Sequence, residues 1–297
     1  MTYVVGIATQ VGVYLIAILG VSVICGFTGM FSMGHAGFMA IGAYVSSLLS
    51  MRLGLPVPVS ILCGTALATL FGVLVSLPTL KLRDDYFLIV TLGVGEGVRL
   101  IIQNLTDLTG GARGLTSIPR FTNIWIVLVC LLLTIAFIKA FLKSKFGRNC
   151  IAIREEELAA KSVGISIFRY KLIAMTISCV LCGLSGGLLA HYMGYLTPNL
   201  FRMVKSEELI IPVILGGRGS LTGTIIAGLL LLPLPELLRF GSAQEWRMVV
   251  YAFLVIIVIT FRPSGLMGTK ELTLRGIQDA WRKAADWLHS RRKGEKV

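Results

Sequence analysis

The chain consists of long apolar runs separated by short polar connections, and most of these runs are long enough to cross a lipid bilayer. A helix rises about 1.5 Å per residue, so about 20 apolar residues span a hydrocarbon core of about 30 Å. The runs lack the alternation of barrel strands, and only helices or closed barrels satisfy their backbone groups in lipid. The pattern therefore predicts an all-α, polytopic integral membrane protein, a bundle of about eight to ten segments. The expected segments are 4–25, 36–52, 57–77, 86–103, 123–142, 171–192, an interrupted pair within 207–234, and 247–262.

Composition agrees with this class, because 55% of the residues are hydrophobic, 14% are charged and the mean hydropathy is +0.83. Soluble domains carry about 25% charged residues. The six cysteines lie mostly inside apolar runs, where the role of a small buried side chain is favoured over metal or redox chemistry. The sequence therefore predicts neither a disulfide framework nor a metal site.

The net charge of +13 is concentrated in two segments. Residues 139–171 hold eight Lys and Arg against three acidic residues, and residues 262–297 hold nine against four. Basic connections stay on the cytoplasmic side of a membrane, where they face anionic lipid head groups. Both segments are therefore expected in the cytoplasm, and a nucleic-acid partner is not expected. With 143–170 inside, counting the segments places 81–85 inside and 104–122 outside.

These assignments divide the chain into two regions. Residues 1–268 form the predicted transmembrane domain, which includes the connection 143–170 that is expected in the cytoplasm. Residues 269–297 carry apolar side chains at steps of three and four, with Lys and Arg on the other face. That pattern predicts a basic amphipathic helix at the cytoplasmic membrane surface. On the outer side, 106–114 is either a plain connection or a contact for an external partner.

The most polar part of the cytoplasmic connection is Arg154–Gly164. Its charged residues are compatible with a solvated helix, and Ala159, Ala160 and Gly164 leave room for another protein to pack closely. A membrane protein that is driven from outside itself needs such a contact. The chain contains no Gly-x-x-x-x-Gly-Lys-[Ser/Thr] phosphate loop, so ATP binding by that motif is not expected. An ordinary inner connection is the alternative interpretation.

Glycine-rich segments interrupt the apolar runs at two places, 26–37 and 216–223. Glycine tolerates unusual backbone angles, and a broken helix at membrane depth must line a cavity or be covered by protein. Paired interruptions in the two halves of a chain are typical of an internal repeat beside a transport path. Close packing of small residues between helices is the alternative, and the 33 glycines of the chain would also serve it.

Few ionisable residues lie within the predicted spans. Glu96 and Arg99 are three residues apart, so they can face each other on one helix. Such a pair is either functional or fixes helix packing, and one acid with one base gives little support to a proton relay. His35, beside the first glycine segment, is expected to hydrogen-bond freed backbone groups rather than to bind a ligand.

Six groups of residues occur in order over most of the chain. They are Gly26, Gly29, Ser32, Gly34, His35, Ala36 and Phe38 with Gly42, Ala43 and Tyr44; Tyr86, Phe87, Ile89, Thr91, Gly95, Glu96, Val98 and Arg99; Leu108, Thr109, Gly110, Gly111 and Gly114; Phe146, Gly147, Arg148, Ala152, Ile153, Arg154 and Glu155; Leu215, Gly216, Gly217, Gly219 and Ser220; and Phe261, Arg262, Pro263, Gly265 and Leu266. Together they resemble the branched-chain amino-acid ABC transporter permease family. The second group and the cytoplasmic connection resemble its longer, M-type permease subunit.

This resemblance implies an all-helical permease of the B12-importer-like (type II) fold with broken helices, paired with a homologous second permease. Two cytoplasmic ATPase subunits and a periplasmic or lipid-anchored solute-binding protein would complete the transporter in the bacterial inner membrane. The chain itself would be a non-catalytic subunit without a cofactor, since ATP and Mg²⁺ belong to the ATPases. It would import branched-chain amino acids, or related small polar solutes, by alternating access.

Other functions remain as alternatives. The same machinery could be specific for urea or short-chain amides, since the sequence shows no set of residues that selects an amino acid. A self-contained secondary carrier would need titratable groups along the path, and Glu96 is the only obvious acid. A passive channel would conduct without nucleotide.

The residues expected to carry the function form two sets. The resemblance identifies Arg154–Gly164 with the coupling helix of ABC permeases, whose usual Glu-Ala-Ala-x-x-x-Gly here begins with Leu158. The candidates for ATPase coupling are Arg148, Arg154, Glu155, Glu156, Glu157, Ala159, Ala160 and Gly164. The candidates for the translocation pathway are Gly29, Ser32, Gly34, His35, Thr91, Glu96, Arg99, Gly216, Gly217 and Gly219.

Overall fold

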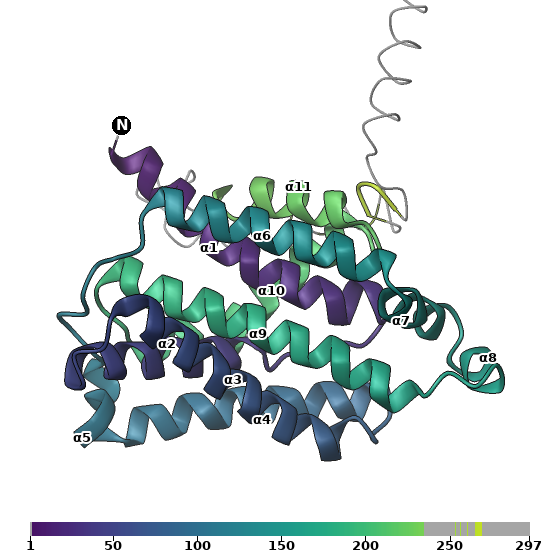
Figure 1. The fold of residues 1–297 in the computed structure, drawn as a ribbon, viewed down its shortest axis with the longest axis horizontal. Helices are drawn as coiled ribbons and strands as arrows, with labels where there is room; N and C mark the ends of the chain where they lie inside the picture. The colour runs from purple at the N-terminus through teal and green to yellow at the C-terminus, as the bar shows by residue number, and fades with distance from the viewer. Residues whose placement is uncertain (1, 235–252, 254–255, 257–259, 261–264, 269–297) are drawn as a thin grey trace, which may run out of the picture.

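The protein is a bundle of helices in a computed structural model that describes residues 2–234, 253, 256, 260 and 265–268 (Figure 1). Within these residues there is no strand, and a single isolated β-bridge joins Leu115 to Leu196. The longer helices are α1 (Thr2–Val21), which continues as a π-helix (Ser22–Phe27), α2 (His35–Arg52), α3 (Val57–Thr79), α4 (Asp84–Asn104), α6 (Ile124–Lys143), α9 (Ile167–Met193), α10 (Met203–Gly216) and α11 (Leu221–Leu231). The shorter ones are α5 (Thr106–Thr109), α7 (Lys145–Glu155), α8 (Glu157–Ser162) and two 3₁₀ turns (Gly111–Arg113 and Pro198–Phe201).

Four of the described helical segments are long and apolar enough to cross a membrane, judged by length and composition. They are Tyr3–Phe27, Val57–Thr79, Ile124–Lys143 and Ile167–Met193. Each coincides with an expected span, so these predictions are confirmed. Most of the expected span 247–262 and the whole of the expected tail helix 269–297 lie outside the described residues.

Helix α2 lies at the centre of the bundle, packed against α3, α4 and α9. It carries Ser46, Ser47 and Ser50, and their buried hydroxyls donate to backbone carbonyls within the helix. A helix that is surrounded by other helices does not need an apolar surface toward lipid, provided its polar groups are satisfied. This position explains why α2 is less apolar than the four segments above.

Glycines bring α2 and α9 close together. A Cβ added at Gly42 would lie 2.7 Å from the Gly183 Cα, and one added at Gly186 would lie 2.8 Å from the Met39 carbonyl carbon. Real Cβ atoms do not approach backbone atoms this closely, so only glycine fits at either position. Small residues that let helix backbones approach are typical of membrane bundles. For these glycines, close helix packing is therefore the correct interpretation.

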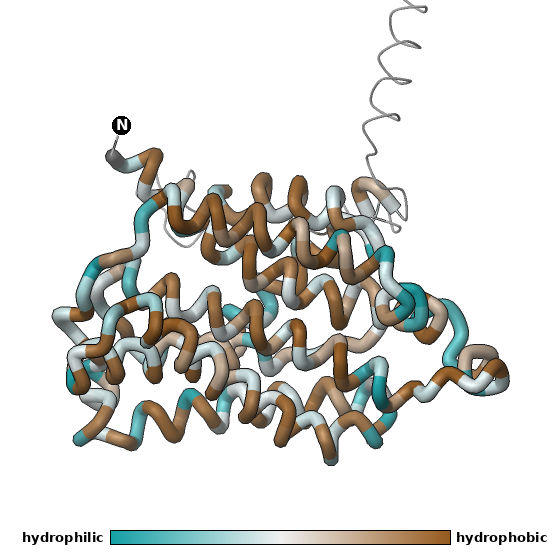
Figure 2. Tube along the Cα trace, viewed as in Figure 1, coloured by the Kyte–Doolittle hydropathy of each residue, from teal (hydrophilic) through white to brown (hydrophobic). Residues whose placement is uncertain are grey.

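Helix α6 lies at the outside of the bundle against α1 (Figure 1). Only Val127, Thr134 and Ile138 of this helix are buried. Figure 2 shows hydrophobic residues along most of its length. Such a surface is compatible only with lipid or another apolar partner. The exposed large side chains are Trp125, Leu128, Val129, Leu132, Leu133 and Phe137.

The two ends of the bundle are formed by different connections between the helices. At one end lie α7, α8 and the α3–α4 connection (Figure 1). At the other end, the connection between α4 and α6 is ordered by backbone contact with the segment after α9. Leu115 and Leu196 exchange backbone hydrogen bonds of 2.9 and 2.8 Å, and Gly114 fits because a Cβ there would overlap Leu196.

The interrupted pair forms a hairpin, because α10 and α11 pack against each other. Helix α10 begins at Met203, several residues before the apolar run Ile210–Leu215 that predicted it. It starts beside α4 and ends at Gly216, and the connection that follows contacts Arg154 of α7 at Gly219. The interrupted pair within 207–234 is expected from the sequence, whereas the start of α10 at Met203 is not.

Candidate functional site

The two glycine interruptions, almost 200 residues apart in the chain, lie against each other at the α7 end of the bundle. The first consists of the π-helix and the non-helical residues 28–34, and the second joins α10 to α11. A Cβ at Gly26 would lie 3.4 Å from Val213 Cγ1 and 3.8 Å from the Gly219 nitrogen. The Arg218 guanidinium lies 4.6 Å from the centre of the Phe31 ring. The paired breaks therefore form one structural unit.

Arg154, near the end of α7, links both interruptions. Its Nη1 donates a 2.9 Å hydrogen bond to the Gly26 carbonyl. Its Cγ lies 3.0 Å from where a Gly29 Cβ would be, and its Cζ lies 3.2 Å from where a Gly219 Cβ would be. The Arg154 side chain is only 14% exposed and also pairs with Glu155. A side chain of the connection 143–170 thus contacts the π-helix after α1 and the connection between α10 and α11 at once.

Helix α7 lies at one end of the bundle (Figure 1), with a capped N-terminus and a buried contact with α9. Its N-cap, Ser144, accepts a hydrogen bond of 3.3 Å from the Gly147 amide, and such caps satisfy an otherwise unpaired helix N–H. Cys150 is fully buried, and its Sγ lies 3.8 Å from the Tyr170 carbonyl of α9. Burial raises the pKa of the Cys150 thiol, so it is an inert packing group.

The predicted coupling helix is two short helices rather than one. The chain turns at Glu156, which has extended backbone angles (φ −157°, ψ 108°), and α8 starts at the next residue. Two members of the coupling set face inward, since Ala160 is 5% exposed and Arg154 fills the glycine interruptions. The members that are exposed, and thus accessible to another protein, are Arg148, Glu155, Glu156, Glu157, Ala159 and Gly164.

Gly164 ends α8 with a left-handed backbone (φ +86°). The Gly164 amide donates to the Lys161 carbonyl at 3.0 Å, and the Ile165 amide donates to the Ala160 carbonyl at 3.1 Å. These two bonds form a Schellman motif, in which glycine avoids the Cβ penalty of the left-handed region. No atom of the described residues lies within 4 Å of an added Cβ, so the space beside Gly164 is open in this part of the chain.

Four pathway candidates cluster where the first interruption meets α4. The Met33 amide donates to Thr91 Oγ1 at 3.1 Å, and a Cβ at Gly34 would lie 2.8 Å from the Thr91 carbonyl oxygen. His35 Nδ1 lies 2.9 Å from the Ser32 carbonyl, which confirms its expected role as a partner for freed backbone. Two buried polar atoms here, Ser32 Oγ and His35 Nε2, have no hydrogen-bond partner among the described residues.

Glu96 and Arg99 form the predicted pair, with Arg99 Nε 2.6 Å from Glu96 Oε2. The other Glu96 oxygen accepts a 2.8 Å hydrogen bond from the Met203 amide, the first N–H of α10. A carboxylate at a helix N-terminus satisfies an unpaired N–H and interacts favourably with the helix dipole. Glu96 therefore joins α4 to α10, which favours the packing interpretation over a proton relay.

Replacing Glu96 with Gln should destabilise the protein by about 1.5–3 kcal/mol, because Arg99 and the α10 N-terminus lose a charged partner. Adding Arg99→Met to Glu96→Gln should recover part of this loss, since the guanidinium that has lost its carboxylate partner is then removed as well. Thermal unfolding of the purified variants in detergent measures both effects. Additive single effects in this double-mutant cycle would show that the two side chains are not coupled.

The remaining pathway candidates lie at the α7 end, away from Glu96. Gly216 packs against Gly223 of α11, and Gly217 (φ +109°) packs against Gly268. The Leu266 amide donates to the Leu215 carbonyl at 2.7 Å. These glycines are thus covered by backbone on both sides, and the structure does not bring them together with Glu96 and Arg99.

The sequence did not predict two contacts of the site. One is Met203, whose amide binds Glu96 although it precedes the apolar run of its helix. The other is the ion pair between Lys205 and Glu208, with the Lys205 ammonium 4.5 Å from the centre of the Tyr14 ring. The i, i+3 spacing of Lys205 and Glu208 is visible in the sequence, whereas the contact with α1 is not.

The family described as branched-chain amino acid transport system / permease component matches residues 3–259 of this chain. The chain belongs to this permease family. The permease is 35% identical to the high-affinity branched-chain amino acid transport system permease protein LivM of Escherichia coli (strain K12), over 89% of this chain and 69% of LivM. It is 25% identical to the corresponding protein LivH of Salmonella typhimurium, over 87% of this chain and 92% of LivH.

A solved structure has the same fold. The permease resembles a chain of PsaBC from Streptococcus pneumoniae in complex with Fab, with a TM-score of 0.50 and 17% identity, over 86% of this chain and 90% of that chain. This likeness confirms the predicted all-helical fold of the type II class. Membership of the family confirms a multi-pass membrane protein that acts as a non-catalytic permease subunit of an ABC transporter.

Proposed function

We propose that this permease forms half of the membrane path of an importer for branched-chain amino acids, and that it works by alternating access. The names of its relatives LivM and LivH support this substrate class over urea or short amides. The observation that carries the mechanism is the insertion of Arg154 between the two glycine interruptions. Arg154 connects the exposed residues of α7 and α8, on the proposed cytoplasmic side, to the helices that would open the path.

The proposed partners are a second permease like LivH, two ATPase subunits at the α7–α8 end, and a solute-binding protein at the opposite end. The excess of basic residues in 139–171 supports a cytoplasmic position for α7 and α8. In that orientation the chain begins outside, and the cytoplasm also holds the α3–α4 connection and the 269–297 tail.

The proposed coupling mechanism has three steps. Closure of the ATPases on ATP moves α8 through its exposed residues Glu157 and Ala159 and through Gly164, which follows the helix. Helix α7 transmits the motion, because its buried face fixes it to α9. Arg154 then displaces both interruptions, and Gly29, Gly217 and Gly219 absorb the change, since each already has a positive φ.

Opening of the interruptions would expose polar groups to the path. Ser32 Oγ and His35 Nε2 are buried without partners among the described residues, so they are available to a passing solute or to water. They form the proposed inner lining together with Gly34 and Thr91. Because the binding protein selects the solute, such a path needs no strong site of its own.

Reconstitution in liposomes tests this function. We expect leucine uptake to require ATP, the ATPases, the second permease and the binding protein together. Gradient-driven uptake by this chain alone would instead establish a secondary carrier, and flux without nucleotide would establish a channel. Competition by urea or acetamide, but not by isoleucine or valine, would overturn the substrate class.

Replacing Gly164 with Trp should uncouple ATP hydrolysis from transport while leaving membrane insertion intact. The indole would occupy the open space beside α8, and the left-handed backbone would add a strain of about 1–2 kcal/mol. Uptake and ATPase activity of the reconstituted transporter measure the effect.

Gly54→Trp is a matched control, because Gly54 also has a positive φ (+61°) and open surroundings but lies at the opposite end. It should leave coupling unchanged. Gly164→Ala introduces the backbone strain of a Cβ without the bulk of an indole, so it distinguishes the two effects. This variant should retain most of the transport. Normal uptake by Gly164→Trp would count against the assignment of α8 as the coupling element.

A further inference from the structure

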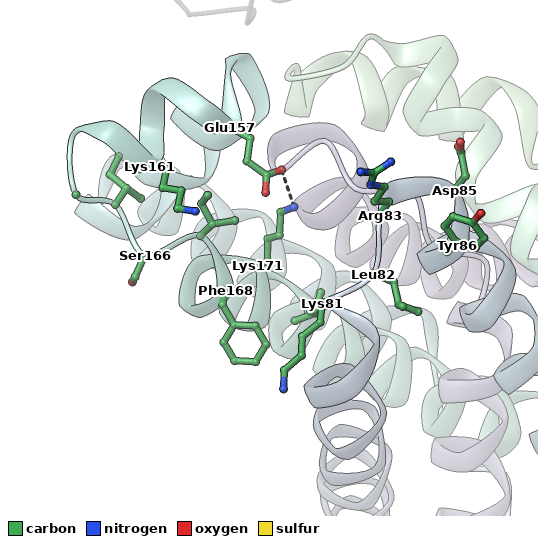
Figure 3. Close-up of a pocket in the computed structure, with 14 residues that line it drawn as sticks. Lys81, Leu82, Arg83, Asp85, Tyr86, Glu157, Lys161, Ser166, Phe168 and Lys171 are labelled. Carbon is green, nitrogen blue, oxygen red and sulfur yellow. Dashed lines mark hydrogen bonds and ion pairs between the residues drawn. The ribbon is translucent and has the colours of Figure 1, made fainter.

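An open groove of about 950 Å³ lies between α8 and the α3–α4 connection. Figure 3 shows Glu157 and Lys161 of α8 on one side of the groove, and Arg83, Asp85 and Tyr86 on the other. Lys171, from the first turns of α9, lies between them and forms an ion pair of 2.8 Å with Glu157 (Figure 3). The groove thus joins two cytoplasmic connections that are about 75 residues apart in the chain.

The groove carries an excess of unpaired positive charge. It is lined by four basic residues and two acidic ones, Asp85 and Glu157. Among the described residues, no ion pair or side-chain hydrogen bond engages Lys81, Arg83 or Lys161, whereas Lys171 has Glu157. Three cations without partners around one opening are complementary to an anion.

Most of the remaining lining is apolar. Figure 3 shows Leu82 and Phe168 in the groove, and their exposed fractions are 43% and 36%. Leu80, Ile165 and Ile167 complete the apolar part of the lining. Helix α3 ends just before Leu80, and Leu74 and Leu77 in its last two turns are exposed. An inorganic anion would leave this apolar surface unused, whereas an amphiphile would cover both parts.

The groove and the proposed ATPase contact share Glu157 and Gly164, but the exposed surface of α8 extends beyond the groove. Glu157, Lys161 and Gly164 line the groove at helical spacing. Leu158 and Val163 do not line it, and they are 76% and 81% exposed. An ATPase subunit can therefore contact Leu158, Ala159 and Val163 on this outward face while the groove remains occupied.

We propose that this groove binds the phosphate of an anionic phospholipid, with its acyl chains along α3. Arg83, Lys81 and Lys161 would neutralise the phosphate, and Leu82 and Phe168 would contact the glycerol and upper acyl carbons. Only the choice of the cytoplasmic leaflet depends on the orientation given under the proposed function. The lipid would brace α8 against the α3–α4 connection from the membrane side.

Native mass spectrometry of the full-length chain in detergent tests this site, with phosphatidylglycerol and phosphatidylcholine of equal chain length as probes. We expect preferential retention of phosphatidylglycerol. The double variant Lys81→Ala/Arg83→Ala should weaken retention by about tenfold or more, because each cation near a lipid phosphate contributes roughly a factor of five. Inorganic phosphate and glycerol phosphate at the same concentration should not compete.

Lys143→Ala/Lys145→Ala is the matched control. It removes the same charge at the same end of the bundle, from two exposed lysines that do not line the groove. It should leave phosphatidylglycerol retention unchanged. Equal retention of the two lipids, equal loss in the two double variants, or displacement by inorganic phosphate would each overturn the proposal.

Lipid retention is measured without transport, so the two proposals can fail separately. Preferential phosphatidylglycerol binding without ATP-driven uptake would contradict the proposed function alone. Uptake that depends on ATP, with no preference between the lipids, would contradict the lipid site alone. Thermal unfolding midpoints of both double variants verify that each chain is folded.

Discussion

Replacing Arg154 with Ala should reduce ATP-driven uptake by about 100-fold or more while membrane insertion and pairing with the second permease persist. Transport through the proposed mechanism requires the movement of α7 to reach both glycine interruptions, and Arg154 contacts Gly26, Gly29 and Gly219. A loss of this size corresponds to about 2.7 kcal/mol of coupling free energy. The structure also loses a partner for the Gly26 carbonyl, which costs about 1–3 kcal/mol.

Uptake and ATP hydrolysis, measured together in proteoliposomes, distinguish uncoupling from misfolding. We expect hydrolysis to continue without uptake in the Arg154→Ala variant. Arg154→Lys should restore little, because an ammonium is a point charge and lacks the planar donors that reach Gly26.

Arg169→Ala is the control for Arg154→Ala, since Arg169 is exposed near the same end and has no ion pair among the described residues. It should transport normally. Wild-type uptake by Arg154→Ala would show that the glycine interruptions move without this link.

Replacing Gly186 with Ala should destabilise the protein by about 3 kcal/mol or more and reduce the amount of folded protein in the membrane. The new Cβ would overlap the Met39 carbonyl and lie 3.1 Å from the Ala43 nitrogen. Both contacts are with helix backbone, so α2 and α9 must separate along their whole interface. Side-chain rotation cannot relieve this overlap.

Gly93→Ala is the matched control for Gly186→Ala. Gly93 is also a helical glycine, but no atom lies within 4 Å of an added Cβ. The substitution should be neutral or stabilising by up to about 1 kcal/mol, because alanine has the higher helix propensity. Unfolding temperature and the monodisperse fraction after detergent extraction measure both variants. Similar stability of the two variants would contradict the close approach of α2 and α9.

Local patterns in the sequence predicted the helices well. The apolar runs located α1, α3, α6 and α9, because a helix of about 20 hydrophobic residues matches the thickness of the hydrocarbon core. The spacing of Glu96 and Arg99 predicted their ion pair, since residues three apart are neighbours on any helix. The glycine content of 26–37 and 216–223 likewise predicted both interruptions.

Other features were outside the reach of local patterns. The coupling segment divides at Glu156, where α7 ends after packing against α9. No proline or glycine at this position indicates the break in the sequence. The early start of α10 depends on Glu96, which supplies the partner for its first N–H. The groove beside α8 is formed by two connections that are remote in the chain, so composition alone could not reveal it.

The sequence by itself determined that this protein is a helical membrane permease, where its main helices lie, and which segment is polar enough to contact soluble partners. These properties follow from hydrophobicity, charge and backbone freedom, which act over short stretches of chain. Only the tertiary structure decided that Arg154 bridges the two glycine interruptions and that Glu96 binds the start of α10. Both contacts join residues more than 100 positions apart, and they depend on helix packing that no local pattern encodes.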